Sequence, residues 1–200
     1  MERAKAPFLP YENVNSKAQG TLLACGWDGS IPVDIEAIVE FRLGIEIVPV
    51  RGLQDDYSVD GFLTLDLTRI AVDEYILECH PTRYRFTLAH ELGHRVLHAD
   101  VFGGLDITTA KEWVEFYLGL DEQDYGWFER QAYWFAGALL VPDEPLVAEY
   151  ESTLSKLESR GLMRDDLSYH GRSQVAGTLA KRFFVSTGVM QRRLGEVGVW

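Results

Sequence analysis

The chain is poor in cysteine and lacks long apolar runs. Cys25 and Cys79 are the only cysteines among 200 residues, and they are too few and too far apart for a disulfide framework or a Cys-x-x-Cys zinc site. Free thiols in a reducing compartment are therefore expected. The N-terminal residues do not resemble a secretion signal, and no run approaches the roughly 20 apolar residues of a membrane span. These absences predict a cytoplasmic protein without a membrane partner.

Basic side chains are also scarce. Nineteen lysines and arginines stand against 31 aspartates and glutamates, which gives a formal charge of −12. Such a charge opposes non-specific attraction to nucleic acid or anionic lipid, so direct DNA binding is not expected. The 200 residues are 46% hydrophobic, which suffices for one domain with a core but not for two of full size. A single domain spanning residues 1–200 is therefore predicted.

The most informative stretch is Arg85-Phe-Thr-Leu-Ala-His90-Glu91-Leu-Gly-His94-Arg-Val-Leu-His98, which contains the pattern His-Glu-x-x-His. On a helix, His90 and His94 project from the same face and can share one Zn²⁺ ion. Bound zinc lowers the pKa of its water to roughly 7, and a neighbouring carboxylate can take the proton as that water attacks a carbonyl. Glu91 is the expected general base. The pattern predicts a metallopeptidase centre.

Two histidines leave a catalytic zinc one protein ligand short, because such sites usually hold three. His98 lies about 6 Å further along the helix axis than His94 and cannot easily close on the same ion. Glu129 is the better candidate, because it shares a helix face with apolar residues and its carboxylate would point inward. A buried carboxylate is costly unless it has a partner such as a metal. Small Ala132 on the same face would allow a close approach to the histidine helix.

Other candidates for the site have simpler interpretations. Glu112 and Glu115, the alternative third ligands, suit a solvated face. His98 is expected to be a hydrogen-bonded histidine behind the ligands or in the core, and His80 and His170 are assigned to loops. The oxyanion partner stays open among Tyr84, Tyr125, Tyr133 and His98. A site of two histidines and one glutamate also accepts Mn²⁺, Fe²⁺ or Co²⁺.

Apolar residues three or four positions apart predict several helices. These are Tyr11–Trp27 (ending at Gly26), Asp34–Leu43, Thr82–Ala99, Trp127–Val141 and Asp143–Arg160, with Asp34 and Asp143 as N-caps. Alternating, β-branched segments predict strands at Ile45–Val50, Gly61–Asp66 and Ile70–Val72. Because the connections between the strands are too short for helical crossovers, a small, mostly antiparallel sheet is expected. The fold class is therefore α+β.

Three further segments bear on the site. Gly93 inside the histidine helix indicates a close approach by a neighbouring backbone, and an edge strand is the expected neighbour. Residues Asp100–Tyr125 are acidic and poorly patterned, which suggests a variable insertion over the site with one short helix at Glu112–Leu118. Residues Asp165–Ser173 are assigned to a loop.

From about residue 173 to 200, two helical patterns meet at Val185-Ser186, with Ser186 as the second N-cap. This spacing is similar to a helix-turn-helix, and four cations lie nearby: Lys181, Arg182, Arg192 and Arg193. A DNA-binding regulator is therefore an alternative function. The preferred interpretation is that these helices pack on the domain and help to hold its substrate. A third possibility is a module with inert zinc that sequesters a repressor or toxin.

Several separated blocks agree, in order, with one known family. The most specific are Arg85-Phe-Thr-Leu-Ala-His-Glu-Leu-Gly-His-x-x-Leu-His98 and Glu129-x-Gln-Ala-x-x-Phe-Ala136-x-x-Leu-Leu-x-Pro142. Weaker matches are Pro32-Val-Asp-Ile-Glu-Ala-Ile, Gly61-Phe-Leu, and Leu179-Ala-x-x-Phe-x-Val-Ser186 followed by Arg193-Leu194. From roughly Pro32 onward, the chain resembles the ImmA/IrrE metallopeptidases.

This resemblance implies a zincin-like (gluzincin) core with zinc bound by His90, His94 and Glu129, and Glu91 as the catalytic carboxylate. It also implies a protein substrate, because members of the family typically cleave a helix-turn-helix repressor and so derepress mobile-element, prophage or stress-response genes. One position departs from the family, which commonly has asparagine where this sequence has Tyr133. Tyr133 would then either hydrogen-bond a substrate carbonyl or narrow the cleft.

Overall fold

The computed structural model describes residues 5–64, 66–102, 111–112, 115–116, 119–159, 161 and 168–200. Its helices are α1 (Tyr11–Ala24), the π-helix η1 (Ala37–Arg42), α2 (Leu53–Tyr57), α3 (Glu74–Cys79), α4 (Pro81–Phe102), α6 (Glu122–Leu140), α7 (Asp143–Glu158), α8 (Tyr169–Phe183) and α9 (Thr187–Glu196). Its strands are β1 (Glu46–Val50), β2 (Gly61–Leu63) and β3 (Arg69–Asp73). The class is α+β, as predicted.

The three strands form a mixed sheet in the order β1-β3-β2. β3 runs antiparallel to β2 and parallel to β1, so the prediction of a mostly antiparallel sheet was wrong. The connections are indeed too short for a long helical crossover. However, β3 returns from a hairpin into the gap between β1 and β2, and this insertion creates a parallel pair without a long crossover. The sequence did not predict two short helices, α2 and α3. Along the chain, α2 precedes the hairpin and α3 follows it.

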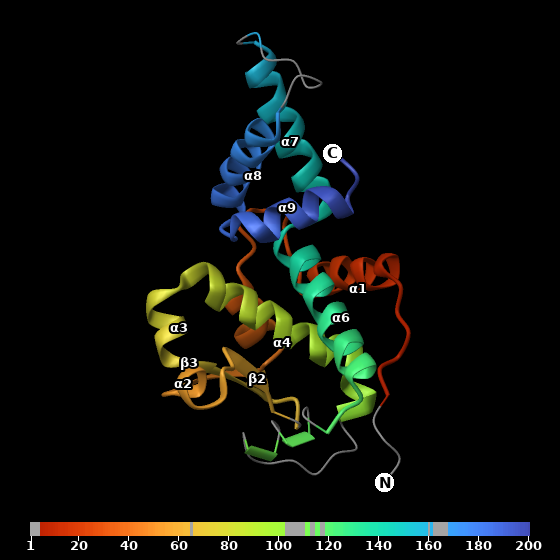
Figure 1. The fold of residues 1–200 in the computed structure, drawn as a ribbon, viewed down its shortest axis with the longest axis vertical. Coiled ribbons are helices and arrows are strands. Elements are labelled where there is room, and N and C mark those ends of the chain that lie inside the picture. Colours follow the sequence, from red (N-terminus) through yellow and green to blue (C-terminus); the bar gives the residue numbers. More distant parts are fainter. Residues whose placement is uncertain are drawn as a thin grey trace.

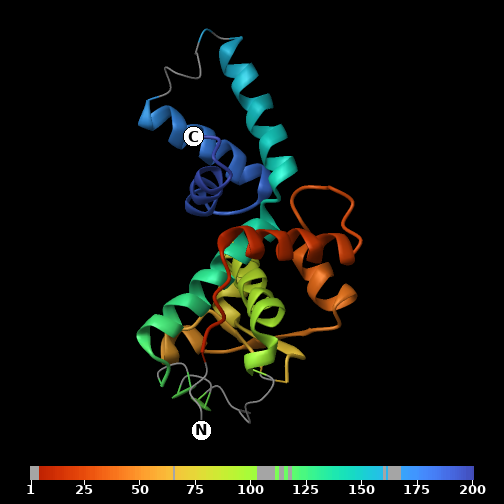
Figure 2. The same cartoon turned by 90° about the vertical axis from the view of Figure 1, so that its right-hand side faces the viewer.

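Helices α4 and α6 lie side by side at the centre of the molecule, with the sheet next to α4 and α1 against α6 (Figures 1 and 2). The two helices approach each other closely at Gly93. A Cβ atom added there would lie 3.2 Å from both Cα and the carbonyl oxygen of Ala132. The close neighbour is therefore α6, not the predicted edge strand. Small Ala132 has the role that the sequence predicted for it.

Several helix ends differ from the predictions. The N-cap of α6 is Asp121, whose carboxylate accepts a hydrogen bond from the Gln123 N–H at 3.0 Å, so the helix starts before Trp127. Residues 169–173, predicted as a loop, are the first turns of α8, and its N-cap Ser168 accepts from Gly171. Asp143 does not cap α7, because its carboxylate pairs with other side chains. The predicted N-cap Asp34 is confirmed, since it accepts from Ala37 N–H at 3.0 Å.

The C-terminal helices α7, α8 and α9 stand together beyond the end of the α4–α6 pair (Figure 1). Ser186 caps α9 by accepting a hydrogen bond from Val189 N–H at 3.2 Å, as predicted. Apolar side chains of α8 and α9 belong to the same core cluster as those of α1, α4 and α6. The C-terminal helices are therefore packed on the rest of the molecule through a shared apolar core.

Two further expectations concern the segment after α4 and membrane-spanning helices. The predicted insertion at Asp100–Tyr125 overlaps the end of α4 and the start of α6. Residues 103–110, 113–114 and 117–118, which include part of the predicted short helix Glu112–Leu118, lie outside the described residues, and residues 111–112 and 115–116 are helical. Among the helices that the structure describes, none is long and apolar enough to cross a membrane.

Candidate metal centre

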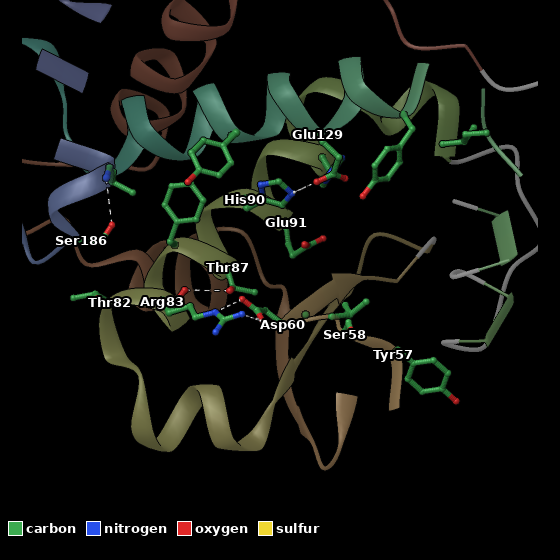
Figure 3. A pocket seen from close by; sticks show the side chains of 18 of the residues that line it. Tyr57, Ser58, Asp60, Thr82, Arg83, Thr87, His90, Glu91, Glu129 and Ser186 are labelled. Carbon is green, nitrogen blue, oxygen red and sulfur yellow. Dashed lines mark hydrogen bonds and ion pairs between the residues drawn. The ribbon is translucent and has the colours of Figure 1, made fainter. Parts of the chain in front are cut away.

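Three predicted side chains converge where α4 faces α6. His90 and His94 project from one side of α4, and their Nε2 atoms are 3.2 Å apart. Glu129 on α6 reaches both, with its two carboxylate oxygens 3.2 Å from His90 Nε2 and 3.5 Å from His94 Nε2 (Figure 3). Tight packing at Gly93 brings the two histidines close to Glu129. Gly93 lies beside His94 and contacts Ala132, which is less than one turn from Glu129.

The arrangement fits a single transition-metal ion. Within the described part of the chain, His90, His94 and Glu129 form the one group of three metal-type side chains, with ligand atoms within 4.8 Å of one another. Two imidazole nitrogens and one carboxylate are a donor set that Zn²⁺ accepts, and three protein ligands leave one position free for water. All three side chains are shielded from solvent at least in part, which limits competition from water.

The electrostatics of the three groups are coupled. Burial alone would raise the pKa of Glu129, but hydrogen bonds and positive charge from His90 and His94 outweigh it and hold the pKa well below its ordinary value. Burial acts to lower the pKa of His90. The hydrogen bond to Glu129 and the negative charge of Glu129 outweigh burial, so the pKa of His90 is raised. The Glu129 carboxylate is thus kept negative, as a metal ligand must be, whereas the raised pKa of His90 means that a metal ion must displace the proton of this imidazole when it binds.

Glu91 lines the same cavity but is held apart from the three ligands. One of its oxygens accepts a hydrogen bond from the backbone N–H of Leu63, at the end of β2, at a distance of 2.8 Å. The residue is 4% exposed, and this burial raises the pKa of its carboxyl group. A carboxylate with a raised pKa is a better proton acceptor near neutral pH than an ordinary one. Strand β2 therefore fixes the orientation of the predicted general base.

A chain of hydrogen bonds continues behind His94. His94 Nδ1 lies 3.1 Å from His98 Nδ1, and His98 Nε2 lies 2.9 Å from Gln131 Oε1. Gln131 in turn donates from Nε2 to the Pro7 carbonyl at 2.6 Å. Burial lowers the pKa of His98 to about 3, so this imidazole is neutral. One assignment satisfies every atom: His94 donates to His98, which donates to Gln131.

His98 thus has the supporting position expected for it, whereas Gln131 was missed. A signal was present in the sequence, because Gln131 is the one amide in the predicted helix Trp127–Val141, which is otherwise apolar on nearly every side. Both side chains are fully buried. Hydrogen bonds of this kind orient a metal ligand and increase its basicity.

The ligands open into a cavity of about 900 Å³. It is lined by α4, by α6, by residues 57–61 before and at the start of β2, and by the start of α9. Tyr125 and Tyr133, two candidates for stabilising an oxyanion, line this cavity. Tyr84 does not, because it is buried elsewhere and hydrogen-bonds Glu36. Ser186 and Val189 of the C-terminal segment also form part of the wall, which agrees with the prediction that the C-terminal helices pack on the domain.

The alternative ligands lie away from the centre. Glu112 and Glu115 are both exposed, and Glu115 is 3.8 Å from Lys111. His80 follows the end of α3 and its ring packs against Tyr75, while His170 is exposed at the start of α8 beside Tyr169. None of these four residues belongs to the ligand group.

A His-Glu-x-x-His helix packed against a glutamate helix in an α+β fold is the arrangement of side chains typical of zinc peptidases. The family follows from comparison with known proteins. Residues 42–195 match the model of the Peptidase_M78 family, described as the IrrE N-terminal-like domain. The chain therefore belongs to this family, as the sequence resemblance predicted. No curated protein matches the chain.

Among solved structures, the chain is similar to a Mycobacterium tuberculosis transcriptional regulator, with a TM-score of 0.51 and 16% identity. The match covers 93% of this chain and 52% of that one, so this chain spans about half the length of the regulator. At this level of identity, the likeness concerns the fold alone.

Proposed function

We propose that this protein is a zinc-dependent endopeptidase in which His90, His94 and Glu129 bind the metal and Glu91 is the general base. The observation that carries the proposal is the convergence of three metal-type ligand atoms within 4.8 Å, in a cavity that is also lined by the separately held carboxylate of Glu91. Membership of the peptidase family supports the same reaction. Mn²⁺, Fe²⁺ or Co²⁺ could take the place of zinc.

The protein side chains have distinct tasks in this reaction. Bound zinc would supply an acidified water and polarise the carbonyl of the peptide bond to be cut. Glu91, fixed by the Leu63 N–H and with a raised pKa, would accept the water proton and pass it to the leaving amine. Tyr125 and Tyr133 line the cavity and carry hydroxyl groups that can donate to the developing oxyanion.

For the substrate, we propose a helix-turn-helix transcriptional repressor, cleaved in the cytoplasm to derepress mobile-element, prophage or stress-response genes. This rests on the family resemblance. The identity of the gene next to this one is the most informative lead, because a neighbouring repressor would be the first protein to test. The helices from about residue 173 to 200 are included in the peptidase unit, because Ser186 and Val189 line its cavity.

Replacing Glu91 by Gln tests the reaction. We expect the zinc-loaded E91Q variant to lose cleavage of a randomised peptide library, and of a neighbouring repressor, by about 10² to 10⁴-fold, because the amide cannot accept the proton. Cleavage is read by mass spectrometry and zinc content by atomic absorption. E91Q should keep its zinc, since Glu91 is not in the ligand group. If repressor inactivation survives E91Q with zinc retained, the protein acts by binding rather than by cutting.

The alternative, a DNA-binding or sequestering regulator, has less support. Two of the cations near the helix-turn-helix-like segment are engaged within the protein: Arg182 pairs with Glu149 at 2.7 Å, and Arg193 is 1% exposed. Arg192 lies over the Tyr133 ring at 4.2 Å from its centroid. Of the four cations near this segment, three therefore already contact other groups of the protein, which leaves few for contacts with DNA phosphates. Salt-dependent binding to duplex DNA would favour the alternative.

A further inference from the structure

The cavity has two chemically different ends, one on each side of the metal ligands (Figure 3). One end is lined by Tyr57 and Ser58 and by the acidic residue Glu122, which lies two turns before Glu129 on α6. The other end is reached in the opposite direction along α6 and is bounded by α9. Five uncharged residues line this end: Thr82, Phe86, Tyr133, Ser186 and Val189. The guanidinium of the neighbouring Arg83 is paired with Asp60 at 2.5 Å. We call this end the apolar subsite.

The wall of the apolar subsite is an aromatic pair next to a metal ligand. The rings of Phe86 and Tyr133 have centroids 4.6 Å apart, and each centroid is 6.4 Å from that of His90. Phe86 lies one turn before His90 on α4, and Tyr133 lies one turn after Glu129 on α6. The same two helices therefore set the positions of both the metal ligands and this wall.

The far side of the apolar subsite is closed by α9. Val189 lines the cavity and is only 6% exposed. Arg192, about one turn further along α9, has its guanidinium 4.2 Å from the centroid of the Tyr133 ring, a cation–π contact that holds α9 against the wall. The subsite is therefore built from three helices that are distant in sequence.

A peptide carbonyl placed at the metal ligands has its neighbouring Cα atoms within about 4 Å along the chain. The side chain on one of them is then within reach of Phe86 and Tyr133. Because the wall is uncharged and largely apolar, it favours an apolar side chain large enough to touch both rings. Small or charged side chains would leave the wall unfilled or lose their hydration without a partner.

We propose that the apolar subsite selects substrates with a large apolar residue, such as leucine, methionine or phenylalanine, directly beside the bond that is cut. This inference rests on the proposed peptidase function and defines its substrate class. Such residues are usually buried in folded proteins, so the cleaved segment must be one that can leave its own fold.

The test uses zinc-loaded protein and three peptide hydroxamates, identical except for an alanine, leucine or phenylalanine side chain next to the metal-binding group. We expect the wild-type protein to bind the leucine and phenylalanine compounds at least tenfold more tightly than the alanine compound. In Val189→Trp the indole fills the subsite, so this preference should fall below about threefold. Affinities are measured by calorimetry, so cleavage is not needed for the readout.

The matched control is Thr187→Trp, which adds the same ring to an exposed position of α9 outside the cavity and should keep the preference. Tyr133→Ala provides a second variant in case Val189→Trp does not fold, and it should weaken the phenylalanine compound more than the alanine compound, because the alanine side chain is too short to fill the wall. Equal wild-type affinities, or a preference that survives both cavity variants, would overturn the subsite. A preference without any peptide cleavage would instead overturn the proposed peptidase function.

Discussion

At the scale of single residues, the candidate centre depends on groups that do not touch the metal position. Gln131 connects the Pro7 carbonyl to His98, and His98 contacts the inner nitrogen of His94. Because His98 is neutral and fully buried, it has no competing solvent partner. His94 is thereby held in one ring orientation, with Nε2 facing Glu129 and His90.

We predict that Gln131→Leu lowers zinc affinity by about 10 to 100-fold, the usual effect of removing a group that orients a metal ligand. Leucine leaves His98 without its acceptor, so the His94 ring loses its fixed orientation. Affinity is measured by competition with a chromogenic chelator. The control is Gln123→Leu, at an exposed position in the first turn of the same helix. Equal affinities for the two variants would contradict the orienting role of Gln131.

At the scale of elements, the approach of α4 to α6 decides whether three ligands can meet. A Cβ added at Gly93 would be 3.2 Å from two backbone atoms of Ala132 and from Phe135 Cδ1, which is tighter than an ordinary contact. Gly177, in the middle of α8, has no such neighbour within 4 Å. The two glycines are both helical, and they differ in what surrounds them.

This difference predicts opposite results for the same substitution. Gly177→Ala should raise the free energy of unfolding by up to about 1 kcal/mol, because alanine is the better helix former. In Gly93→Ala, the tight contact of the added methyl group with α6 should cancel this gain, so the free energy of unfolding should stay unchanged or fall. Zinc binding should weaken, because the contact displaces Glu129. Urea unfolding and chelator competition provide the two measurements. An equal gain for both variants would show that α6 yields readily at Ala132.

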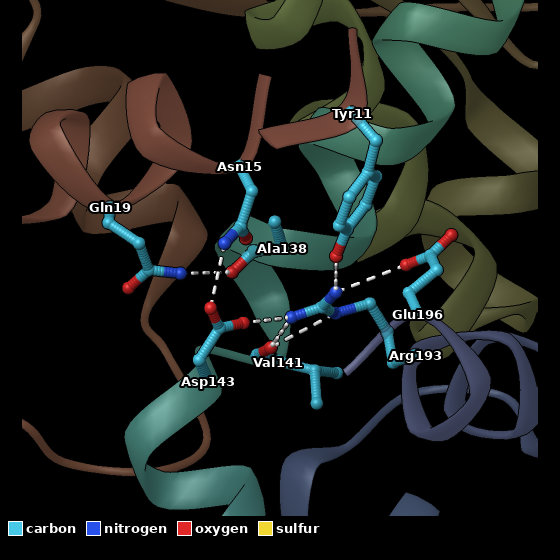
Figure 4. A network of polar contacts seen from close by, with 8 residues as sticks. All are labelled: Tyr11, Asn15, Gln19, Ala138, Val141, Asp143, Arg193 and Glu196. Atoms are coloured by element: carbon cyan, nitrogen blue, oxygen red, sulfur yellow. Dashed lines mark hydrogen bonds and ion pairs between the residues drawn. The ribbon is translucent and has the colours of Figure 1, made fainter. Parts of the chain in front are cut away.

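At the scale of the whole molecule, Arg193 on α9 ties the C-terminal helices to the rest (Figure 4). Its guanidinium donates to the Val141 carbonyl at 3.0 and 3.2 Å, to Asp143 at 2.5 Å and to Glu196 at 3.1 Å, and also to the Tyr11 hydroxyl. These partners come from α1, from the junction of α6 and α7, and from α9 itself. The position of the cavity wall on α9 therefore depends on one buried cation.

We expect Arg193→Leu to lower the free energy of unfolding by about 3–5 kcal/mol, the cost of removing one partner from a buried ionic network. The neighbouring Arg192→Leu should cost at most about 1 kcal/mol, because that cation is exposed and makes only a ring contact. Urea unfolding monitored by circular dichroism separates the two. Similar losses would mean that the buried network contributes little to holding α9.

The helices and strands near the site were largely predictable, because periodicity is a local property of the sequence. Strand order was not, since the insertion of β3 between β1 and β2 depends on how the hairpin folds back onto β1. Helix ends were missed where a cap replaced the apolar pattern, as at Asp121 and Ser168. The predicted cap Asp143 instead serves Arg193, a partner 50 residues away, which no local pattern reveals.

By itself, the sequence determined which residues could form a metal centre, because the spacing of His90 and His94 on one helix and the inward face of Glu129 on another are matters of helical geometry. Only the tertiary structure decided what surrounds that centre. The Leu63 N–H on Glu91, the hydrogen bonds from His94 to Pro7, and the placement of Val189 in the cavity wall all join distant segments. Such contacts arise from packing of the whole chain, and no local periodicity in the sequence predicts them.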